Sequence, residues 1–378
     1  MKKIFWIAGE KSGDQHASYI LKELNKRGYP LKNFGIGGPR MKREKFKSLF
    51  PFHKFNVMGF VEVIKHICFF FKVEKRIKKI FRTERPDLIV LVDYPGFNLR
   101  IAQIAFDLEI PVIYYISPQF WAWKHKRVYK MEKCIDFVAT ILPFENELLN
   151  MHRIDNKFVG HPVSEELTIE LSQNNFANKY SLDMSKKWIS FLPGSRDDEI
   201  RKKLPIFLDT IKKMDDSKYE FLISKADSVS YNIFYNFIRG SNLPSVKIID
   251  EDIYELMKYS YLLVVTSGTA TIETAYLGTP FIIVYKTSKI SYEIGKRLVK
   301  IKMIGLPNII LDKKVIPELV QDDFNPKRLF NEISAIADNE ARYKSIQKNL
   351  KELQSFIGSK KPSKEMADLI ESYLDETD

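Results

Sequence analysis

A run of apolar residues at 262–265 leads into small polar residues and then into a predicted helix. Ser267, Gly268 and Thr269 would place backbone N–H groups and hydroxyls at the start of that helix, where a phosphate or diphosphate binds favourably. Glu273 follows one turn later, where its carboxylate could accept hydrogen bonds from a ribose diol. This spacing favours a sugar nucleotide as ligand, although a well-capped helix after a core strand also fits the segment.

Arg196 lies in a second turn of this kind, because segment 191–196 (FLPGSR) also ends a predicted strand before a helix. A guanidinium there could reach a diphosphate, and its planar fork matches phosphate oxygens. The alternative is a solvated arginine at a helix start. The acidic residues 197–199 fit the negative charge preferred in a first helical turn, which makes them weak metal-ligand candidates.

Asp93 directly follows the apolar run 88–92, which predicts a buried strand. A carboxylate at the carboxyl end of such a strand is partly desolvated, so its pKa can rise toward the range of a general base. Asn98 could orient this carboxylate or a substrate hydroxyl. The alternative is that Asp93 only caps the next turn.

Two further loops follow predicted strands. Segment 9–14 (GEKSGD) matches neither the dinucleotide-binding nor the P-loop pattern, which disfavours a nicotinamide enzyme and a P-loop kinase. Segment 117–124 (SPQFWAWK) places Ser117 and Trp121 on a loop, where two tryptophans could stack against a sugar or an acyl chain. Core packing is the alternative for both rings.

Asp250 and Asp252 form an Asp-x-Asp pattern after a predicted strand and could hold a metal–nucleotide pair. Asp252 and Glu255 instead predict a capping box for the following helix. No histidine–cysteine cluster has metal-ligand spacing, and we interpret His161, in Gly-His-Pro, as a linker residue. We therefore expect no metal and no cofactor.

Segment 57–81 combines an apolar helical stripe with many lysines. An apolar face bordered by lysines is typical of a helix that lies in a bilayer interface. The residues expected to contact the membrane are Phe60, Ile64, Ile67, Phe70 and Phe71. A helix packed on its own sheet with an exposed basic face is the alternative.

Apolar runs alternate with helical patterns along the chain, which predicts an α/β fold with doubly wound parallel sheets. The expected strands are 4–8, 33–36, 88–92, 112–115, 137–141, 188–192, 219–223, 246–249, 262–265 and 281–284. Ligands of such sheets bind beyond the carboxyl ends of strands. We predict domains over 1–165 and 188–340 with a cleft between them, a connection over 166–187, and C-terminal helices over 341–378 that pack toward the first domain.

The composition is that of a globular protein, with 45% hydrophobic and 29% charged residues among 378. The net charge of +12 would attract nucleic acid, an anionic membrane or anionic substrates. No nucleic-acid-binding motif is present, and a lysine-rich composition explains the charge equally well. Two cysteines make no disulfide framework, and no apolar run reaches the ~18–20 residues that span a bilayer, so we expect a cytoplasmic protein.

Ten segments occur in an order that resembles the lipid-A-disaccharide synthase family (glycosyltransferase family 19). They are AGEKSGD, GIGGPRM, MGFVEV, DYPGFN, SPQFWAWKHKRV, LPFE, FVGHP, LPGSR, SGTATIE and KRLVK…GLPN, and they span nearly the whole chain. The resemblance implies a GT-B glycosyltransferase fold with two Rossmann-like domains. It implies an enzyme of lipid A (lipopolysaccharide) biosynthesis, peripheral on the cytoplasmic face of the bacterial inner membrane.

The reaction implied by this resemblance joins UDP-2,3-diacylglucosamine to the 6-hydroxyl of 2,3-diacylglucosamine-1-phosphate (lipid X), giving a β-1,6 disaccharide and UDP without a metal ion. Asp93 matches the family's essential aspartate and would take the acceptor's proton in one inverting displacement. Arg196 and the helix start at 267–269 would stabilise the leaving diphosphate. Glu273 would hold the ribose, and Asn308 is a further donor-side residue. The expected acceptor residues are Glu10, Ser12, Gly13, Asp14, Asn98, Ser117 and Trp121.

The chain departs from the family pattern at Gly96, where many relatives carry a second acidic residue. Alternatives with the same fold are a peptidoglycan-type N-acetylglucosaminyltransferase and a UDP-GlcNAc 2-epimerase. Two alternatives belong to other functional classes: a lipid-binding scaffold without activity, and a metal-dependent glycosyltransferase that uses Asp250 and Asp252. The acyl-chain preference and the oligomeric state stay open, as does an exchange of the C-terminal helices between protomers.

Overall fold

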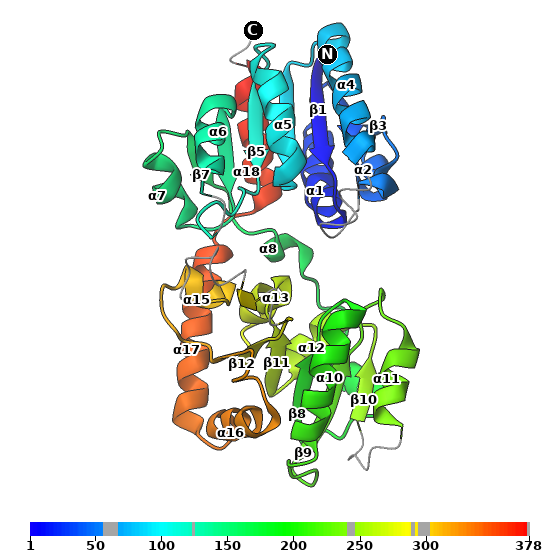
Figure 1. Cartoon of the computed structure of the whole chain (residues 1–378), viewed down its shortest axis with the longest axis vertical. Helices are drawn as coiled ribbons and strands as arrows, with labels where there is room; N and C mark the ends of the chain where they lie inside the picture. Colours follow the sequence, from blue (N-terminus) through cyan, green and yellow to red (C-terminus); the bar gives the residue numbers. More distant parts are fainter. Residues whose placement is uncertain (56–66, 123–124, 240–245, 289–291, 294–302, 376–378) are drawn as a thin grey trace. The chain divides into compact units, whose positions relative to one another are not determined.

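The computed structural model describes residues 1–55, 67–122, 125–239, 246–288, 292–293 and 303–375. The chain forms two compact units, unit 1 over Met1–Pro162 with Lys360–Asp378, and unit 2 over Val163–Ser359 (Figure 1). The first boundary, after Pro162, falls close to the predicted domain end at residue 165. The second boundary, after Ser359, falls inside the predicted C-terminal segment.

Unit 1 contains a seven-stranded parallel sheet in the order β3-β2-β1-β4-β5-β6-β7. Its strands are β1 (Lys2–Ala8), β2 (Leu31–Ile36), β3 (Lys47–Ser48), β4 (Leu88–Val92), β5 (Val112–Tyr115), β6 (Phe137–Thr140) and β7 (Asn156–Phe158). Its helices are α1 (Lys11–Arg27), α2 (Pro39–Arg43), the 3₁₀ helix η1 (Phe52–Lys54), α4 (Ile67–Glu84), α5 (Pro95–Phe106), α6 (Arg127–Cys134), α7 (Glu145–Asn150) and α18 (Pro362–Asp375).

Two apolar layers cover the two faces of this sheet, because alternate side chains of a strand point to opposite faces. Phe5 and Ile7 of β1 belong to the layer that holds the buried residues of α4 and α5. Ile4 and Trp6 belong to the layer that holds those of α1 and α18. Helices therefore bury both faces of the sheet, as the continuous apolar runs of the strands require.

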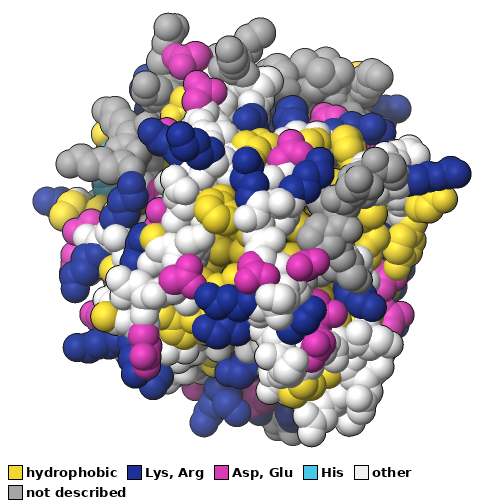
Figure 2. Space-filling model, turned by 90° about the horizontal axis from the view of Figure 1, so that it is seen from below, with side chains coloured by type: hydrophobic (Ala, Val, Ile, Leu, Met, Phe, Trp, Pro, Cys, Tyr) yellow, Lys and Arg dark blue, Asp and Glu magenta, His cyan; other side chains and the backbone are white. Residues whose placement is uncertain are grey.

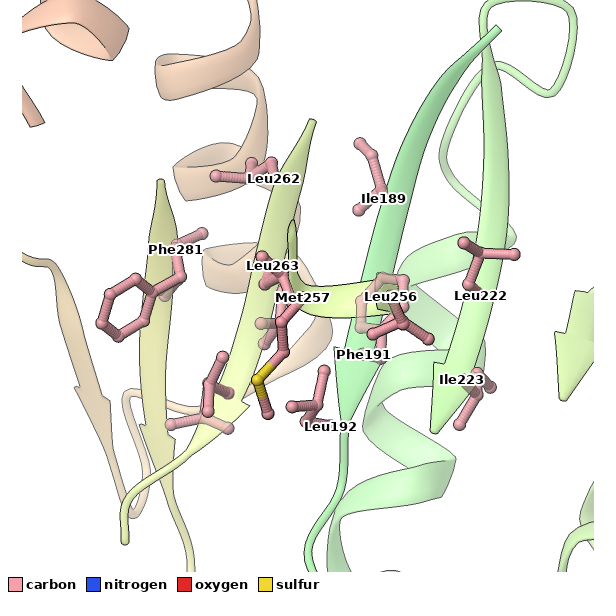
Figure 3. Close-up of a cluster of buried hydrophobic side chains, with 14 of the residues drawn as sticks. Ile189, Phe191, Leu192, Leu222, Ile223, Leu256, Met257, Leu262, Leu263 and Phe281 are labelled. Carbon is pink, nitrogen blue, oxygen red and sulfur yellow. The ribbon is translucent and has the colours of Figure 1, made fainter. Parts of the chain in front are cut away.

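Unit 2 contains a six-stranded parallel sheet in the order β10-β9-β8-β11-β12-β13. Its strands are β8 (Lys187–Leu192), β9 (Tyr219–Ser224), β10 (Val246–Ile249), β11 (Leu262–Thr266), β12 (Phe281–Tyr285) and β13 (Glu318–Val320). Its helices are α8 (Val163–Glu166), α9 (Gln173–Tyr180), α10 (Asp197–Ile211), α11 (Tyr231–Ile238), α12 (Ile253–Tyr259), α13 (Thr269–Leu277), α15 (Leu306–Ile310), α16 (Pro326–Ala337) and α17 (Glu340–Ile357). Figure 3 shows side chains of β8, β9, β11, β12 and α12 that meet in its core, among them Phe191, Met257 and Leu263.

In each sheet the strand order changes direction at one position, which is called the topological switch point. It lies between β1 and β4 in unit 1 and between β8 and β11 in unit 2. In such sheets a ligand binds beyond the carboxyl ends of the strands at this switch point. Gly9 and Asp93 follow the two strands of the first switch point, and Pro193 and Ser267 follow those of the second. The predicted pair of doubly wound parallel sheets is therefore confirmed.

Three short edge strands, β3, β7 and β13, were not predicted. Their segments, Lys47–Ser48, Asn156–Phe158 and Glu318–Val320, are partly exposed and carry no apolar run. Edge strands need only one neighbour, so hydrophobic periodicity does not reveal them.

The two C-terminal helices belong to different units, although the prediction kept them together. Helix α17 packs on α13 in unit 2, and its apolar stripe is buried as far as Ile357. Helix α18, red in Figure 1, packs on α1 in unit 1 through buried residues from Met366 to Leu374. Arg27 Nη1 lies 2.7 Å from Glu371 Oε2 at the edge of this contact. The chain thus crosses from unit 2 to unit 1 after Ser359.

Basic and acidic side chains are interspersed on the face shown in Figure 2, so the positive net charge does not gather there into one patch. Within the described ranges, no helix has the length and apolarity needed to cross a bilayer.

Candidate active site

Asp93 lies at the switch point of unit 1, and the backbone around it is tightly fixed. Asp93 and Tyr94 are both left-handed, with φ of 47° and 51°. The backbone N–H of Asp93 donates to Tyr115 O at 2.9 Å. Its carbonyl accepts from the Tyr114 hydroxyl at 2.5 Å and from Asn98 Nδ2 at 2.6 Å. Consecutive non-glycine residues in this conformation cost energy and are typical of functional sites.

Burial of Asp93 favours a carboxyl group that can accept a proton. Burial raises the pKa of Asp93, while the Tyr94 N–H, His16 and Arg127 oppose this rise. Burial and the charge of Asp93 likewise raise the pKa of Glu10. Two neighbouring carboxyl groups with raised pKa values at a strand end fit a general-base site.

Four of the expected acceptor residues lie at these strand ends. Glu10 is the residue before α1, and Ser12 is exposed in the first turn of that helix. Gly13 is buried against Ala8, so its place is a packing position between β1 and α1. The fourth, Asn98, is fully buried below Asp93, and its Oδ1 has no hydrogen-bond partner among the residues that the structure describes.

Asp14 has a structural role that its sequence position did not indicate. Its Oδ1 accepts from the backbone N–H groups of Gly38 and Met41 at 2.7 and 3.1 Å, and its Oδ2 accepts from Arg40 N at 3.0 Å. Asp14 is 3% exposed and caps the start of α2. The geometry therefore does not support the expectation that Asp14 binds the acceptor.

Ser117 and Trp121 also make internal contacts in place of the expected open binding wall. Ser117 is buried, and its hydroxyl donates to a neighbouring carbonyl. Trp121 Nε1 donates to the buried Glu145 Oε1 at 3.2 Å, and its ring meets Phe144 edge-on at 5.0 Å. Trp121 thus follows the core-packing alternative, while Trp123 and Lys124 lie outside the described residues.

Two residues whose charges act on Asp93, His16 and Arg127, were not identified from the sequence. Burial lowers the pKa of His161 to about 3, and His16 contributes to this shift. His161 is 9% exposed and directly precedes Pro162, after which the chain passes into unit 2, so it is a buried residue beside the boundary between the units. No local pattern joins positions so far apart in the chain, so only the fold identifies this group.

A cavity of about 360 Å³ lies at the switch point of unit 2. It is lined by the ends of β8 and β11 and by the first residues of α10, α12 and α13. The predicted donor residues among its lining are Arg196, Ser267, Gly268, Thr269 and Glu273. Two strand-turn-helix segments thus supply five of the six residues predicted for the donor.

The start of α13 is well suited to an anion. Gly268 has φ of 154°, and a Cβ atom placed there would meet no atom within 4 Å. The N-cap residue Gly268 supplies no side-chain cap. The Thr271 N–H donates to Gly268 O at 3.1 Å, so the N–H groups of Thr269 and Ala270 are the ones suited to an anion at this helix start. Ser267 Oγ donates to Ile304 O at 3.2 Å and thus fixes the turn. Thr266, which was not predicted, lines the cavity with a buried hydroxyl that has no partner in the described ranges.

Arg196 and Glu273 both line this cavity. The Arg196 side chain is 63% exposed, and its Nη1 lies 3.5 Å from Glu199 Oε1. Burial and the charge of Glu166 raise the pKa of Glu273 to about 7, and the Tyr254 hydroxyl opposes this rise weakly. A half-buried carboxylate of this kind can accept hydrogen bonds from a diol.

Asn308, the sixth predicted donor residue, is fully buried and holds its own loop together. Its Nδ2 donates to Ile316 O and to Glu318 Oε1, both at 2.8 Å. Its Oδ1 accepts from the backbone N–H groups of Val315 and Ile316 at 3.0 and 2.8 Å. Both ends of the amide are thus occupied, and the expected donor contact is replaced by a structural one.

The capping box predicted at Asp252 does not form. Asp252 has a left-handed backbone and makes no cap, and its Oδ2 accepts from Lys179 Nζ at 2.6 Å and from Tyr180 OH at 2.9 Å. Glu255 Oε1 accepts from the backbone N–H of Glu170 at 2.7 Å. In the part of the chain that the structure describes, no cluster of three or more His, Cys, Asp or Glu side chains could hold a metal ion.

The predicted membrane helix is only partly described. Phe60 and Ile64 lie outside the described residues, as does the side chain of Ile67, the first residue of α4. Phe70 is 8% exposed and packs against other aromatic rings of the core, so its expected membrane contact is wrong. Phe71 is 53% exposed. The described part of α4 thus packs on its own sheet and leaves a basic face outside.

Comparison with known proteins agrees with these features. The family model described as "Lipid-A-disaccharide synthetase" matches residues 4–370. The chain is 32% identical to the lipid-A-disaccharide synthase of Trichlorobacter lovleyi over 100% of this chain and 98% of that protein. It is 36% identical to that of Syntrophus aciditrophicus, over 94% of each chain.

Solved structures of the same fold include the S. aureus MnaA–UDP co-structure, with a TM-score of 0.66 at 13% identity and coverage of 99% of this chain and 97% of that chain. The calicheamicin glycosyltransferase CalG4 gives a TM-score of 0.66 at 12% identity over 99% and 98%. The predicted GT-B fold is thus confirmed. The family model over residues 4–370 and the relatives that match over nearly the whole chain show that this chain belongs to the lipid-A-disaccharide synthase family of glycosyltransferases.

Proposed function

We propose that this chain transfers 2,3-diacylglucosamine from UDP-2,3-diacylglucosamine to the 6-hydroxyl of 2,3-diacylglucosamine-1-phosphate, with inversion at the anomeric carbon. The observation that carries the proposal is the half-buried carboxylate of Asp93, whose backbone is anchored at the switch point of unit 1. The uncapped helix start at Gly268 supplies the complementary anion site in unit 2. Membership of the family supports the class of product, and these two sites support the individual roles.

Asp93 acts as the general base in this proposal. Its carboxylate takes the proton of the 6-hydroxyl while that oxygen forms a bond to the anomeric carbon. The bond from this carbon to the diphosphate oxygen breaks in the same step, and UDP leaves with the electron pair. Attack from the face opposite UDP inverts the configuration and requires a single base. The raised pKa of Asp93 makes it a better proton acceptor than an exposed aspartate.

The residues of the unit 2 cavity stabilise the leaving group. Arg196 and the N–H groups at the start of α13 offset the charge that develops on the diphosphate, and they are already in place before the reaction. Glu273 accepts hydrogen bonds from the ribose hydroxyls. The UDP that is present in the MnaA co-structure supports a nucleoside diphosphate as ligand of this fold.

The acylated substrates suggest a peripheral membrane location. The described part of α4 exposes the ring of Phe71 beside Lys72, Lys75 and Arg76. An apolar ring next to several cations suits an anionic lipid surface. We therefore extend the proposal to contact between this face of α4 and the membrane.

The test is UDP release from the two acylated substrates in detergent, with EDTA present, by the wild type and by Asp93→Asn. We expect wild-type turnover and a loss of several orders of magnitude in the variant, because the amide cannot take the proton. Asp107→Asn is a matched control, since this carboxylate after the end of α5 is exposed and accepts a hydrogen bond from Gln103 Nε2. It should retain wild-type turnover.

Other results would contradict parts of the proposal. A loss of only a few fold in Asp93→Asn would remove the general-base role. UDP binding without wild-type turnover would point to a different acceptor or to a scaffold. Turnover that EDTA abolishes would indicate a metal-dependent transferase.

A further inference from the structure

Lys203 is a buried lysine of unit 2 to which the proposed reaction assigns no role. Its side chain is 1% exposed, and its Nζ donates to the backbone carbonyl of Pro193 at 3.3 Å. Pro193 is the first residue after β8 and begins the turn that carries Arg196 to the cavity. Among the described residues, no carboxylate forms an ion pair with Lys203. A buried ammonium with this single hydrogen bond is costly, so a compensating role is expected.

The turn at 193–196 is held from three sides. Lys203 binds its first carbonyl, as described above. The N–H of Ser195 donates to Glu199 Oε2 at 3.2 Å, and the Ser228 hydroxyl donates to Ser195 O at 2.7 Å. Gly194 has φ of 116°, and a Cβ atom there would lie 2.2 Å from Glu199 Oε2. The shape of the turn is therefore fixed before a ligand arrives, and Lys203 is one of its three anchors.

The charge of Lys203 responds readily to its surroundings. Burial lowers its pKa to about 8. Glu199 favours the charged form, whereas Lys202 and Arg196 oppose it, and all three lie on α10 or directly before it. A diphosphate bound at this turn adds negative charge and therefore favours the ammonium form.

We propose that Lys203 is a positioning residue for the donor diphosphate, because its ammonium group holds the 193–196 turn and adds positive charge behind the phosphates. This inference rests on the proposed function, since it requires a nucleoside diphosphate in the unit 2 cavity. Protonation of Lys203 and binding of the diphosphate are then linked, and each favours the other.

The linkage has a definite sign. Above about pH 8 the free protein loses the Lys203 proton, so diphosphate binding must take up a proton, and affinity falls as pH rises. Stability changes in the opposite direction. The unfolded chain keeps this proton up to the ordinary lysine pKa, so the free energy of unfolding rises with pH over the same interval. A purely structural lysine would show the second effect without the first.

The experiment is titration calorimetry of UDP at about pH 7 and about pH 9, in two buffers of different ionisation enthalpy. The proteins are the wild type, Lys203→Met and the control Lys202→Met, which removes the same charge from an exposed neighbour on α10. All proteins bind the same ligand, so ionisation of UDP itself cancels in the comparison. Between the two pH values we expect the Kd of the wild type to rise by a factor about tenfold greater than the Kd of Lys203→Met.

Proton uptake at the higher pH should occur in the wild type and in Lys202→Met and be lost in Lys203→Met. Equal pH dependence in the wild type and Lys203→Met would overturn the inference. If Lys203→Met does not fold, the wild type alone decides, because absence of proton uptake would overturn the inference. Failure of the wild type to bind UDP at either pH would instead overturn the donor site on which the inference rests.

Discussion

The hydroxyl of Tyr114 donates a 2.5 Å hydrogen bond to the backbone carbonyl of Asp93. Tyr114 lies on β5 and is fully buried, and the charge of Asp93 and burial both hold its pKa well above the ordinary value. The backbone of Asp93, the proposed general base, is therefore held by a side chain of the neighbouring strand, which keeps its proton at every physiological pH.

Replacement of Tyr114 by Phe should slow turnover without affecting the donor site. The change removes one of the two side-chain hydrogen bonds to the Asp93 carbonyl and should cost about 1 kcal/mol of unfolding free energy. We expect kcat to fall about tenfold, because a small displacement of a general base is costly. The Kd of UDP should not change. Tyr129→Phe, at an exposed ring of α6, is the control, and a stability loss with unchanged kcat would show a purely structural role.

Replacement of Thr266 by Val should weaken donor binding. The Thr266 hydroxyl is buried beside the unit 2 cavity and has no partner in the described ranges, so a bound diphosphate is the expected acceptor of its proton. The Kd of UDP should rise about fivefold, while thermal stability stays the same or increases. Thr274→Val removes a buried hydroxyl that is bonded to Ala270 O within α13. That control should lose stability and keep its affinity for UDP; the reverse pattern would contradict the assignment.

Glu145 should make the protein less stable as pH rises. Burial raises its pKa to about 7, above the ordinary value for a glutamate. At a pH between these two pKa values, the folded chain binds a proton that the unfolded chain has lost. The free energy of unfolding therefore falls as pH rises, by up to about 3 kcal/mol. Urea denaturation at about pH 5 and pH 8 should show a smaller difference in Glu145→Gln. Glu147→Gln, on the exposed face of α7, should match the wild type; a Glu145→Gln profile equal to wild type would refute the assignment.

Replacement of Phe71 by Glu should weaken binding to vesicles that contain anionic phospholipid. The ring is exposed, and the Arg100 guanidinium lies 4.7 Å from its centroid. Loss of the ring's apolar contact with the lipid and introduction of a negative charge should lower the partition coefficient about fivefold or more, with the Kd of UDP unchanged. Phe356→Glu, at an exposed ring of α17 in unit 2, is the control. Equal vesicle binding by all three proteins would exclude this face of α4 as the contact.

The alternation of strands and helices was predictable because it rests on local patterns. The bounds of β4, β5 and β10 agree with the predicted 88–92, 112–115 and 246–249. The residues that line the unit 2 cavity were predictable for the same reason. Arg196 and Gly268 lie in the turns that follow β8 and β11, and parallel strands that are adjacent at a switch point bring their following turns together.

The residues whose predicted roles the structure corrects depend on contacts with distant parts of the chain. Asp14 caps a helix that follows another strand, and Asn308 holds a loop that continues to β13. Phe70 and Phe71 are neighbours in one apolar run, yet one is buried and the other exposed. Their roles depend on partners that are distant in the chain.

The sequence by itself determined the two doubly wound sheets, the general-base candidate Asp93 and the turns of the unit 2 cavity, because the spacing of apolar residues, the ends of strands and the turn residues are local properties. Only the tertiary structure decided which polar side chains face a cavity and which complete a hydrogen-bond network. It also decided that α17 and α18 join different units. The free energy that selects among these outcomes comes from burial and hydrogen bonding between remote segments, which no local pattern encodes.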